Sequence, residues 1–138
     1  MIGMLAAVLS LLLLIVPVMY NPQTGGSRSI YEMYIYHRDG EVYRIFLGGI
    51  GGSLLILFSL LNLLFYRSPK NQAITSLITF ILSVLVFGII LFKYFTFKNL
   101  AGPASYFRFS YGAIIPLLVA MLMLFDYLEA KKATKTQP

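Results

Sequence analysis

Four apolar runs, each about as long as a membrane is thick, divide this chain. They cover residues 2–19, 46–66, 73–92 and 111–128. At about 1.5 Å of rise per residue, a helix over each run would be roughly 27–32 Å long, which matches a hydrocarbon core of about 30 Å. Backbone polar groups inside a bilayer must be paired within the segment, so we expect helices. The sequence therefore predicts an all-α membrane protein, a four-transmembrane-helix bundle forming a single domain over residues 1–138.

The overall composition agrees with this class. Hydrophobic residues make up 59% of the 138 and charged residues only 12%, against about 25% charged in soluble domains. A cleaved signal peptide is the alternative for the first run. That run lacks the basic start and the Ala-x-Ala cleavage site of such peptides, so we expect a retained helix.

The basic residues of the connecting segments predict which side of the membrane each end of the four helices faces. Four spans put both termini and the 66–72 turn on one side, which carries five basic residues in 17 positions: Arg67, Lys70, Lys131, Lys132 and Lys135. The opposite side carries six in 44 positions. The higher density predicts that the N- and C-termini, including a tail over residues 129–138, lie in the cytoplasm.

A short alternating stretch, YIYHRDGEVYRI, separates the first two apolar runs. Asp39-Gly40 at its centre is typical of a type I′ turn. In that register Tyr36 faces Tyr43, an aromatic pair that contributes about 0.2–1 kcal/mol. We expect an external β-hairpin over about residues 31–46, between the first and second helices. Five of its residues are candidates for docking a partner protein: Tyr34, Tyr36, His37, Arg38 and Tyr43.

The segments around the predicted hairpin are less regular. The turn-forming NPQTGGSRS before it is assigned no regular structure. The second outer connection, residues 93–110, is rich in aromatic residues, and two interpretations stay open. One is an aromatic belt at the membrane surface. The other is that SYFRFSY adds a third strand to the hairpin.

Small and weakly polar residues recur at helical spacing in two of the predicted helices. GGIGGS opens the second helix, and a stripe that starts at Gln72 runs down the third. Small residues at this spacing let helix backbones approach closely. The predicted packing positions are Gly48, Gly49, Gly52, Ser53, Ser76, Thr79 and Ser83. The alternative for the stripe, together with Asn62, is a polar path for a substrate.

The sequence has little that is typical of an enzyme or of a metal or cofactor site. It contains no Cys and one His. No ionisable residue lies near the middle of a predicted span, where coupled transporters usually place one. We interpret Asp126 and Glu129, near the inner end of the fourth helix, as an interfacial cap. We expect no catalytic residue, no cofactor, no metal, and no nucleic acid among the partners.

Two stretches give the chain a resemblance to a known family. LLNLLFYRSPKNQ leads into AITSLITFILSVLVFGII, and YGAIIPLLVAMLMLFDYLEAKKA comes near the end. This order is similar to a family of small bacterial inner-membrane proteins with four helices, known as a domain of unknown function, over roughly residues 46–130. The resemblance implies the fold and the inner membrane as the compartment. It implies no activity and no catalytic residues.

Two functions of different kinds fit these features. We expect a non-catalytic accessory or structural subunit of a larger bacterial membrane protein complex, surrounded by the lipid bilayer and by other membrane protein subunits. The alternative is a small oligomeric transporter or channel that uses the polar stripe of the third helix. A stable homo-oligomer without other subunits would favour the transporter.

Overall fold

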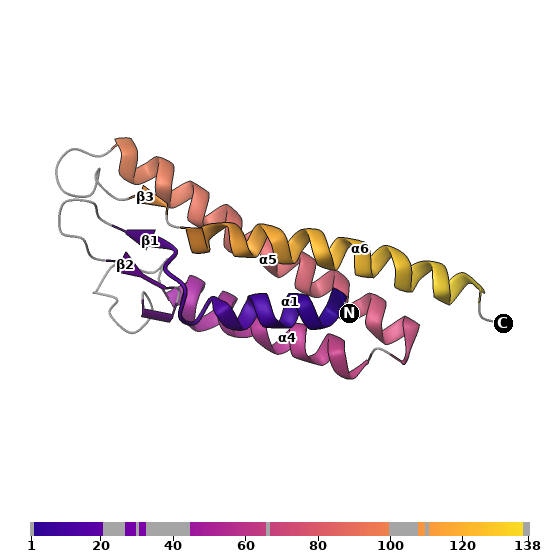
Figure 1. The fold of residues 1–138 in the computed structure, drawn as a ribbon. Helices are drawn as coiled ribbons and strands as arrows, with labels where there is room; N and C mark the ends of the chain where they lie inside the picture. Colours follow the sequence, from indigo (N-terminus) through magenta and orange to yellow (C-terminus); the bar gives the residue numbers. More distant parts are fainter. Residues whose placement is uncertain are drawn as a thin grey trace.

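The computed structural model describes residues 2–20, 27–29, 31–32, 45–65, 67–99, 108–109 and 111–136. Four helices make up most of this part of the chain: α1 (Ile2–Leu12), α4 (Gly52–Leu64), α5 (Pro69–Asn99) and α6 (Ile115–Thr136). They alternate in direction, and each packs mainly against two others in the ring order α1, α4, α5, α6 (Figure 1). The two ends of the chain therefore lie at the same end of the bundle. The predicted bundle of four helices is confirmed.

The first helix ends earlier than predicted. Its α-helical segment stops at Leu12, and tighter turns follow, in which the N–H groups of residues 13 to 15 donate to carbonyl oxygens three residues back (3.1–3.2 Å). Pro17 explains this ending, because its ring disfavours the helical conformation at Val16 and because it has no N–H of its own. The predicted helix over residues 2–19 is therefore wrong over its last turns.

The other three helices differ from the prediction at their ends. A π-helical stretch, η1 (Ile45–Gly51), precedes α4, so helical structure runs from residue 45 to 64, against the predicted 46–66. α5 begins at Pro69, where a missing N–H costs nothing, and continues seven residues past the predicted end at residue 92. α6 follows a 3₁₀ turn, η3 (Tyr111–Ile114), and ends at Thr136. Most of the predicted tail is therefore helical, since its Ala and Lys residues are good helix formers.

Two segments are long and apolar enough to cross a membrane, by length and composition: Pro69–Phe92 and Gly112–Lys135. The other two apolar helices of the described residues, Ile2–Leu12 and Gly49–Leu64, are shorter. By this measure, two of the four predicted spans have the required length.

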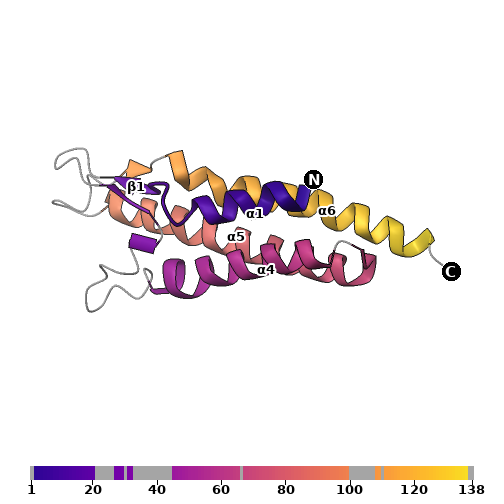
Figure 2. The same cartoon turned by 60° about the horizontal axis from the view of Figure 1, so that its bottom comes forward.

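Three two-residue strands form a small sheet at the end of the bundle opposite the termini. They are β1 (Met19–Tyr20), β2 (Ser27–Arg28) and β3 (Arg108–Phe109), in the order β2-β1-β3 with both pairs antiparallel. Figure 1 labels all three strands, and Figure 2 shows β1 at the end of the bundle opposite the C-terminus. The absence of regular structure predicted for residues 21–29 is therefore wrong at Ser27–Arg28. A strand does form within SYFRFSY, but it pairs with Met19–Tyr20 at the end of the first apolar run.

The β-hairpin predicted over residues 31–46 is not seen in the described part of the chain. Its central residues, 33–44, lie outside the described residues, and so do all five residues predicted to dock a partner. The described residues at its two ends are helical: Tyr31 and Glu32 on one side, and Ile45 and Phe46 in η1 on the other. A hairpin that reaches from Tyr31 to Phe46 is therefore wrong at both ends.

A capping box explains the helical conformation at Tyr31 and Glu32. The Glu32 N–H donates to Ser29 Oγ (3.2 Å), and the Ser29 N–H donates to Glu32 Oε1 (3.3 Å). The buried Ser29 hydroxyl also donates to the carbonyl oxygen of Leu14 (2.9 Å), which ties this turn to the end of α1. Ser-x-x-Glu is a sequence signature of a helix start, and it accounts for the helical conformation at these two residues.

The bundle buries a set of polar groups among its apolar core, and its outer surface is apolar. Apolar side chains such as Leu13, Leu55 and Met123 fill part of the core. Nine polar side chains are also buried: Ser10, Ser29, Ser59, Asn62, Thr75, Ser76, Thr79, Ser83 and Asp126. Large apolar side chains are exposed on every helix, including Met4 (63%), Leu64 (75%), Phe92 (66%) and Phe125 (60%). The apolar outer surface is the opposite of the polar outer face of a soluble helical bundle.

Candidate functional site

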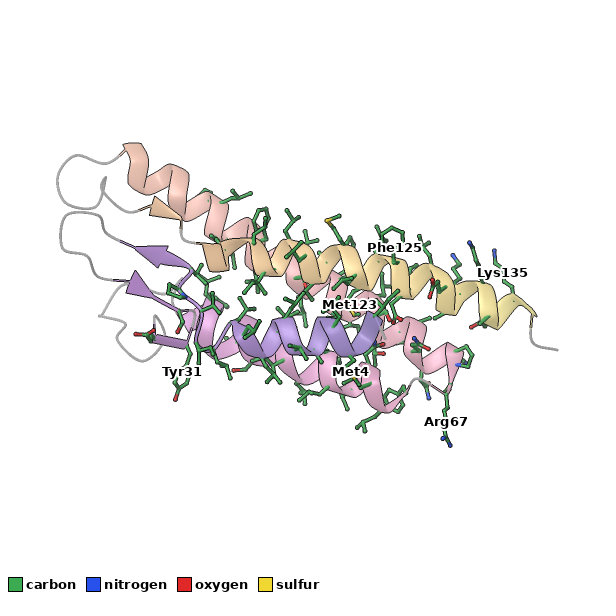
Figure 3. The ribbon with its side chains drawn as sticks, viewed as in Figure 1. Met4, Tyr31, Arg67, Met123, Phe125 and Lys135 are labelled. Atoms are coloured by element: carbon green, nitrogen blue, oxygen red, sulfur yellow. The ribbon has the colours of Figure 1, made fainter. Side chains whose placement is uncertain are left out.

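Five polar side chains from three helices meet inside the bundle. We call them the Asp126 cluster: Asn62 of α4, Gln72, Thr75 and Ser76 of α5, and Asp126 of α6. Gln72 is half-buried and the other four are buried, with Asp126 only 4% exposed. The cluster belongs to the half of the bundle that holds the α4–α5 turn, near the end where Arg67 and Lys135 lie in Figure 3.

Hydrogen bonds join all five members of the cluster. Asn62 Nδ2 donates to Asp126 Oδ2 (3.1 Å), and Gln72 Nε2 donates to Asp126 Oδ1 (2.8 Å). The Thr75 hydroxyl donates to Asn62 Oδ1 (2.8 Å). The Ser76 hydroxyl lies within hydrogen-bond distance of Asn62 Oδ1 (3.0 Å) and also contacts Asp126 Oδ2. The cluster therefore links α4, α5 and α6 through side chains alone.

The first helix closes the cluster from a fourth side. A Cβ on Gly3 would lie 3.0 Å from Asn62 Nδ2 and 3.3 Å from Leu63 Cδ2. At this approach of α1 to α4, a side chain at position 3 would require Asn62 and Leu63 to shift by a few tenths of an ångström, so a small residue suits the position. Gly3, Ala7 and Ser10 follow one another at spacings of four and three, so small-residue spacing in the first apolar run is the signal that marks this face.

The interpretation of Asp126 as part of an interfacial cap is wrong. Its side chain is buried and bonded to two other helices, whereas Glu129, predicted to act with it, is exposed. The physical reason is helical spacing. Val119, Met123, Asp126 and Ala130 recur at intervals of four, three and four, and all are buried, so Asp126 lies on the face of α6 that packs against the bundle. That spacing could have revealed the position from the sequence.

The predicted polar stripe of α5 is found inside the bundle. Ser76, Thr79 and Ser83 have no exposed surface. Thr79 and Ser83 donate to carbonyl oxygens one turn back in their own helix, Thr75 O (2.7 Å) and Thr79 O (2.8 Å). The stripe thus has two parts. Thr79 and Ser83 form their hydrogen bonds within α5, whereas Gln72 and Ser76, nearer the start of the helix, bond to Asp126 of α6.

The packing positions predicted for the second helix lie where η1 meets α4. Gly48 and Gly49 lie in η1, where Gly49 is half-buried, and in α4 Gly52 is buried and Ser53 is exposed. The close approach that the structure records here is at Gly51, where a Cβ would lie 2.8 Å from the carbonyl oxygen of Phe46 in η1 and 3.0 Å from Val86 Cγ2 of α5. Gly51 was not among the predicted packing positions, because the sequence alone does not decide which glycine of GGIGGS faces α5.

A second polar contact joins α1 to α4. The hydroxyls of Ser10 and Ser59 lie 2.9 Å apart, and each also reaches a carbonyl oxygen of its own helix, Ala6 O (2.9 Å) and Leu55 O (2.8 Å). Both side chains are buried. The pair therefore holds the two short helices together across the bundle.

A double-mutant cycle tests the contribution of this pair. We expect Ser10→Ala and Ser59→Ala each to lower the free energy of unfolding, and the double variant to lose less than the sum. The expected coupling energy is about 0.6 kcal/mol, the average for polar contacts between membrane helices. Unfolding in mixed detergent micelles measures all four proteins. Strict additivity would contradict a bond between the two hydroxyls.

Comparison with known proteins identifies the family to which the chain belongs. No curated protein and no solved structure matches the chain. A family model described as a domain of unknown function, DUF4293, matches residues 4–135, well beyond the residues 46–130 on which the resemblance was based. The resemblance to a family of unknown function is confirmed. The chain belongs to the DUF4293 family.

Proposed function

We propose that this chain is a non-catalytic, membrane-embedded structural subunit of a larger membrane protein complex. The observation that carries the proposal is the polarity of the bundle: its buried polar side chains are hydrogen-bonded inside it, to one another or to backbone carbonyl oxygens, while large apolar side chains are exposed on all four helices. Exposing such a surface to water is unfavourable, whereas contact with lipid tails or with apolar helices of other subunits is favourable.

The first part of the proposal is that all four helices are embedded in the bilayer. α1 and α4 are shorter than α5 and α6, yet they carry the same kind of outer surface, with Leu5, Val8 and Leu57 exposed by about half. The turns that follow α1 and the π-helical stretch that precedes α4 extend both elements to more than their α-helical length. The arrangement in Figure 1, with alternating helices and both termini at one end, suits four crossings.

The orientation follows from the basic residues and is open to a direct test. We expect the end with the α4–α5 turn and both termini to face the cytoplasm, because basic residues are retained there. The chain has no Cys, so Lys135→Cys and Gly40→Cys each introduce a unique label site. In intact cells a membrane-impermeant thiol reagent is expected to label position 40 and to reach position 135 only after permeabilisation. The reverse pattern would invert the orientation.

The second part of the proposal is a structural role in preference to transport or catalysis. In the described residues every buried side-chain nitrogen and oxygen has a hydrogen-bond partner. The stripe that would serve as a polar path is held by bonds within α5 and to Asp126. An interior of this kind supports a role in association, because its polar groups already fix the helices against one another.

Gentle extraction tests the proposed role. The tagged full-length chain, solubilised in a mild detergent, is expected to co-purify with the same membrane proteins in fixed stoichiometry. A tagged membrane protein of similar size, expressed at the same level, is the control for non-specific recovery. Recovery of a stable homo-oligomer with no other subunit would overturn the proposal and favour the small transporter or channel.

A further inference from the structure

The outer face of α6 changes from apolar to basic near the end of the helix. Met121, Leu124 and Leu128 are exposed on it, and Lys131 and Lys135, which follow, are exposed as well. These five residues recur at intervals of three, four, three and four, so they form one stripe along the helix. The same stripe that presents apolar side chains to the surroundings therefore presents lysines within one turn of Leu128.

The outer face of α5 changes in the same way. Leu77 and Ile74 are exposed, and Lys70, four residues before Ile74, is exposed on the same face. Because α5 and α6 run in opposite directions, the start of α5 and the end of α6 lie at the same end of the bundle (Figure 1). Two neighbouring helices thus become basic on their outer faces at one end.

A hydrogen bond between the two helices gives the relative height of these lysines. Gln72 Nε2 donates to Asp126 Oδ1 (2.8 Å), so residues 72 and 126 lie at a similar height. At about 1.5 Å of rise per residue, Lys70 lies about 3 Å beyond this bond and Lys131 about 7.5 Å beyond it. The headgroup region of a bilayer is roughly 5–7 Å thick on each side of the hydrocarbon core. Both backbone positions therefore fit within one headgroup layer.

An aromatic contact supports the same placement for Lys131. Its Nζ lies 5.8 Å from the centroid of the Tyr127 ring, one turn back in α6, and Tyr127 is half-buried. Tyrosine is enriched where a membrane meets water, and lysine lays its apolar stem along apolar surface while its ammonium group remains at the polar boundary. The pair is thus of the kind that lies at the headgroup level.

The exposed charges at this end are mainly positive. In the part of the chain that the structure describes, Glu129 is the one exposed acidic residue here, and it precedes Lys131 by two positions, which places it on a different side of α6. Figure 3 shows Arg67 and Lys135 pointing away from the bundle in different directions. The exposed basic residues are Arg67, Lys70, Lys131, Lys132 and Lys135.

We propose that the basic end of α6, together with Lys70 of α5, binds the headgroups of anionic phospholipids. The inference rests on the proposed embedding of the bundle in the bilayer. A lipid whose acyl chain lies against Leu128 has its headgroup beside Lys131, Lys132 and Lys135. Each ammonium group offers three hydrogen-bond donors to the phosphate. A lipid with net negative charge is preferred, because a zwitterionic headgroup offsets its phosphate with a cation of its own.

Fluorescence quenching measures this preference at one place on the protein. The chain has no Trp, so Leu128→Trp introduces a single fluorophore on the exposed face beside the lysines. The full-length variant is reconstituted in mixtures of phosphatidylglycerol and phosphatidylcholine, with bromine in the acyl chains of one lipid or the other. We expect the anionic lipid to associate about fivefold more strongly, the factor for one basic residue beside an anionic membrane surface. Leu124→Trp, one turn away on the same stripe, is a second reporter.

Charge variants connect the preference to the lysines. Replacing Lys131, Lys132 and Lys135 together by Gln is expected to bring the two lipids to equal association. Replacing the same three by Arg keeps the charge and is expected to keep the preference. Glu129→Gln removes the exposed negative charge from the same helix and is expected to maintain or raise the preference. A preference that survives in the Gln variant would overturn the proposal.

Two further outcomes separate this inference from others. Protein that does not enter the vesicles would overturn the proposed embedding and this inference with it, whereas protein that enters and is quenched equally by both lipids would overturn this inference alone. Inorganic phosphate is expected to reduce the preference no more than sodium chloride does at the same ionic strength, because both screen the charges. A larger effect of phosphate would assign the lysines to a free anion and overturn the binding of lipid.

Discussion

Gly112→Ala is expected to prevent stable folding of the bundle, with a loss of about 3 kcal/mol or more in the free energy of unfolding. A Cβ at this position would overlap the carbonyl oxygen of Pro17 and lie 2.8 Å from Val16 Cγ1. The Gly112 N–H donates to that same carbonyl oxygen (2.9 Å), so any movement that relieves the overlap also disrupts the hydrogen bond. The expected readout is loss of the cooperative unfolding transition in detergent.

Gly88→Ala is the matched control for this prediction. Gly88 lies in α5, and a Cβ there would meet no atom within 4 Å. Alanine is the better helix former, so we expect a gain of about 0.5–1 kcal/mol. The same substitution is thus expected to have opposite effects at the two positions. Equal destabilisation by both would show that the contact with Pro17 is not the cause.

Asn62→Ala is expected to have the second largest effect. Asn62 bonds to Asp126, Thr75 and Ser76, which belong to two other helices. Its removal leaves three buried polar groups without this partner and opens a cavity beside Gly3. Polar contacts between membrane helices contribute about 0.6 kcal/mol on average and up to about 1.7, so three lost contacts predict a loss of about 2–5 kcal/mol.

Asn71→Ala serves as the control, since it removes an exposed amide from the first turns of α5. Its expected effect on the free energy of unfolding is within about 0.5 kcal/mol, as for most surface positions. Chemical unfolding in mixed micelles compares the two variants with the wild type. If Asn62→Ala unfolds at the same denaturant concentration as Asn71→Ala, the cluster does not hold the helices together.

The existence of the four helices could be predicted from the sequence because apolar length is a local property. Each run satisfies its backbone hydrogen bonds within itself, so its helical state depends little on the rest of the chain. Local signals also explain two of the errors. Pro17 ends α1 early, and Ser29 with Glu32 starts a helical turn, and both signals are visible in the sequence.

The polar stripe of α5 could also be predicted, because its spacing places Ser76, Thr79 and Ser83 on one face. The spacing did not reveal what that face contacts. Thr79 and Ser83 bond within their own helix, whereas Ser76 bonds to residues 14 and 50 positions away. The partner of a side chain is decided by how neighbouring helices pack.

The sequence by itself determined the number, order and type of the main elements, since these depend on runs of neighbouring residues. Tertiary structure alone decided the hydrogen-bond partners of Asp126, the close approach of Gly112 to Pro17, and the pairing of Met19–Tyr20 with Arg108–Phe109. Each of these joins residues separated by at least 50 positions in the chain. Such contacts arise because packing brings together helix faces that are distant in the chain. The chain contains many similar helix faces, and the local sequence pattern does not determine which of them pack against each other.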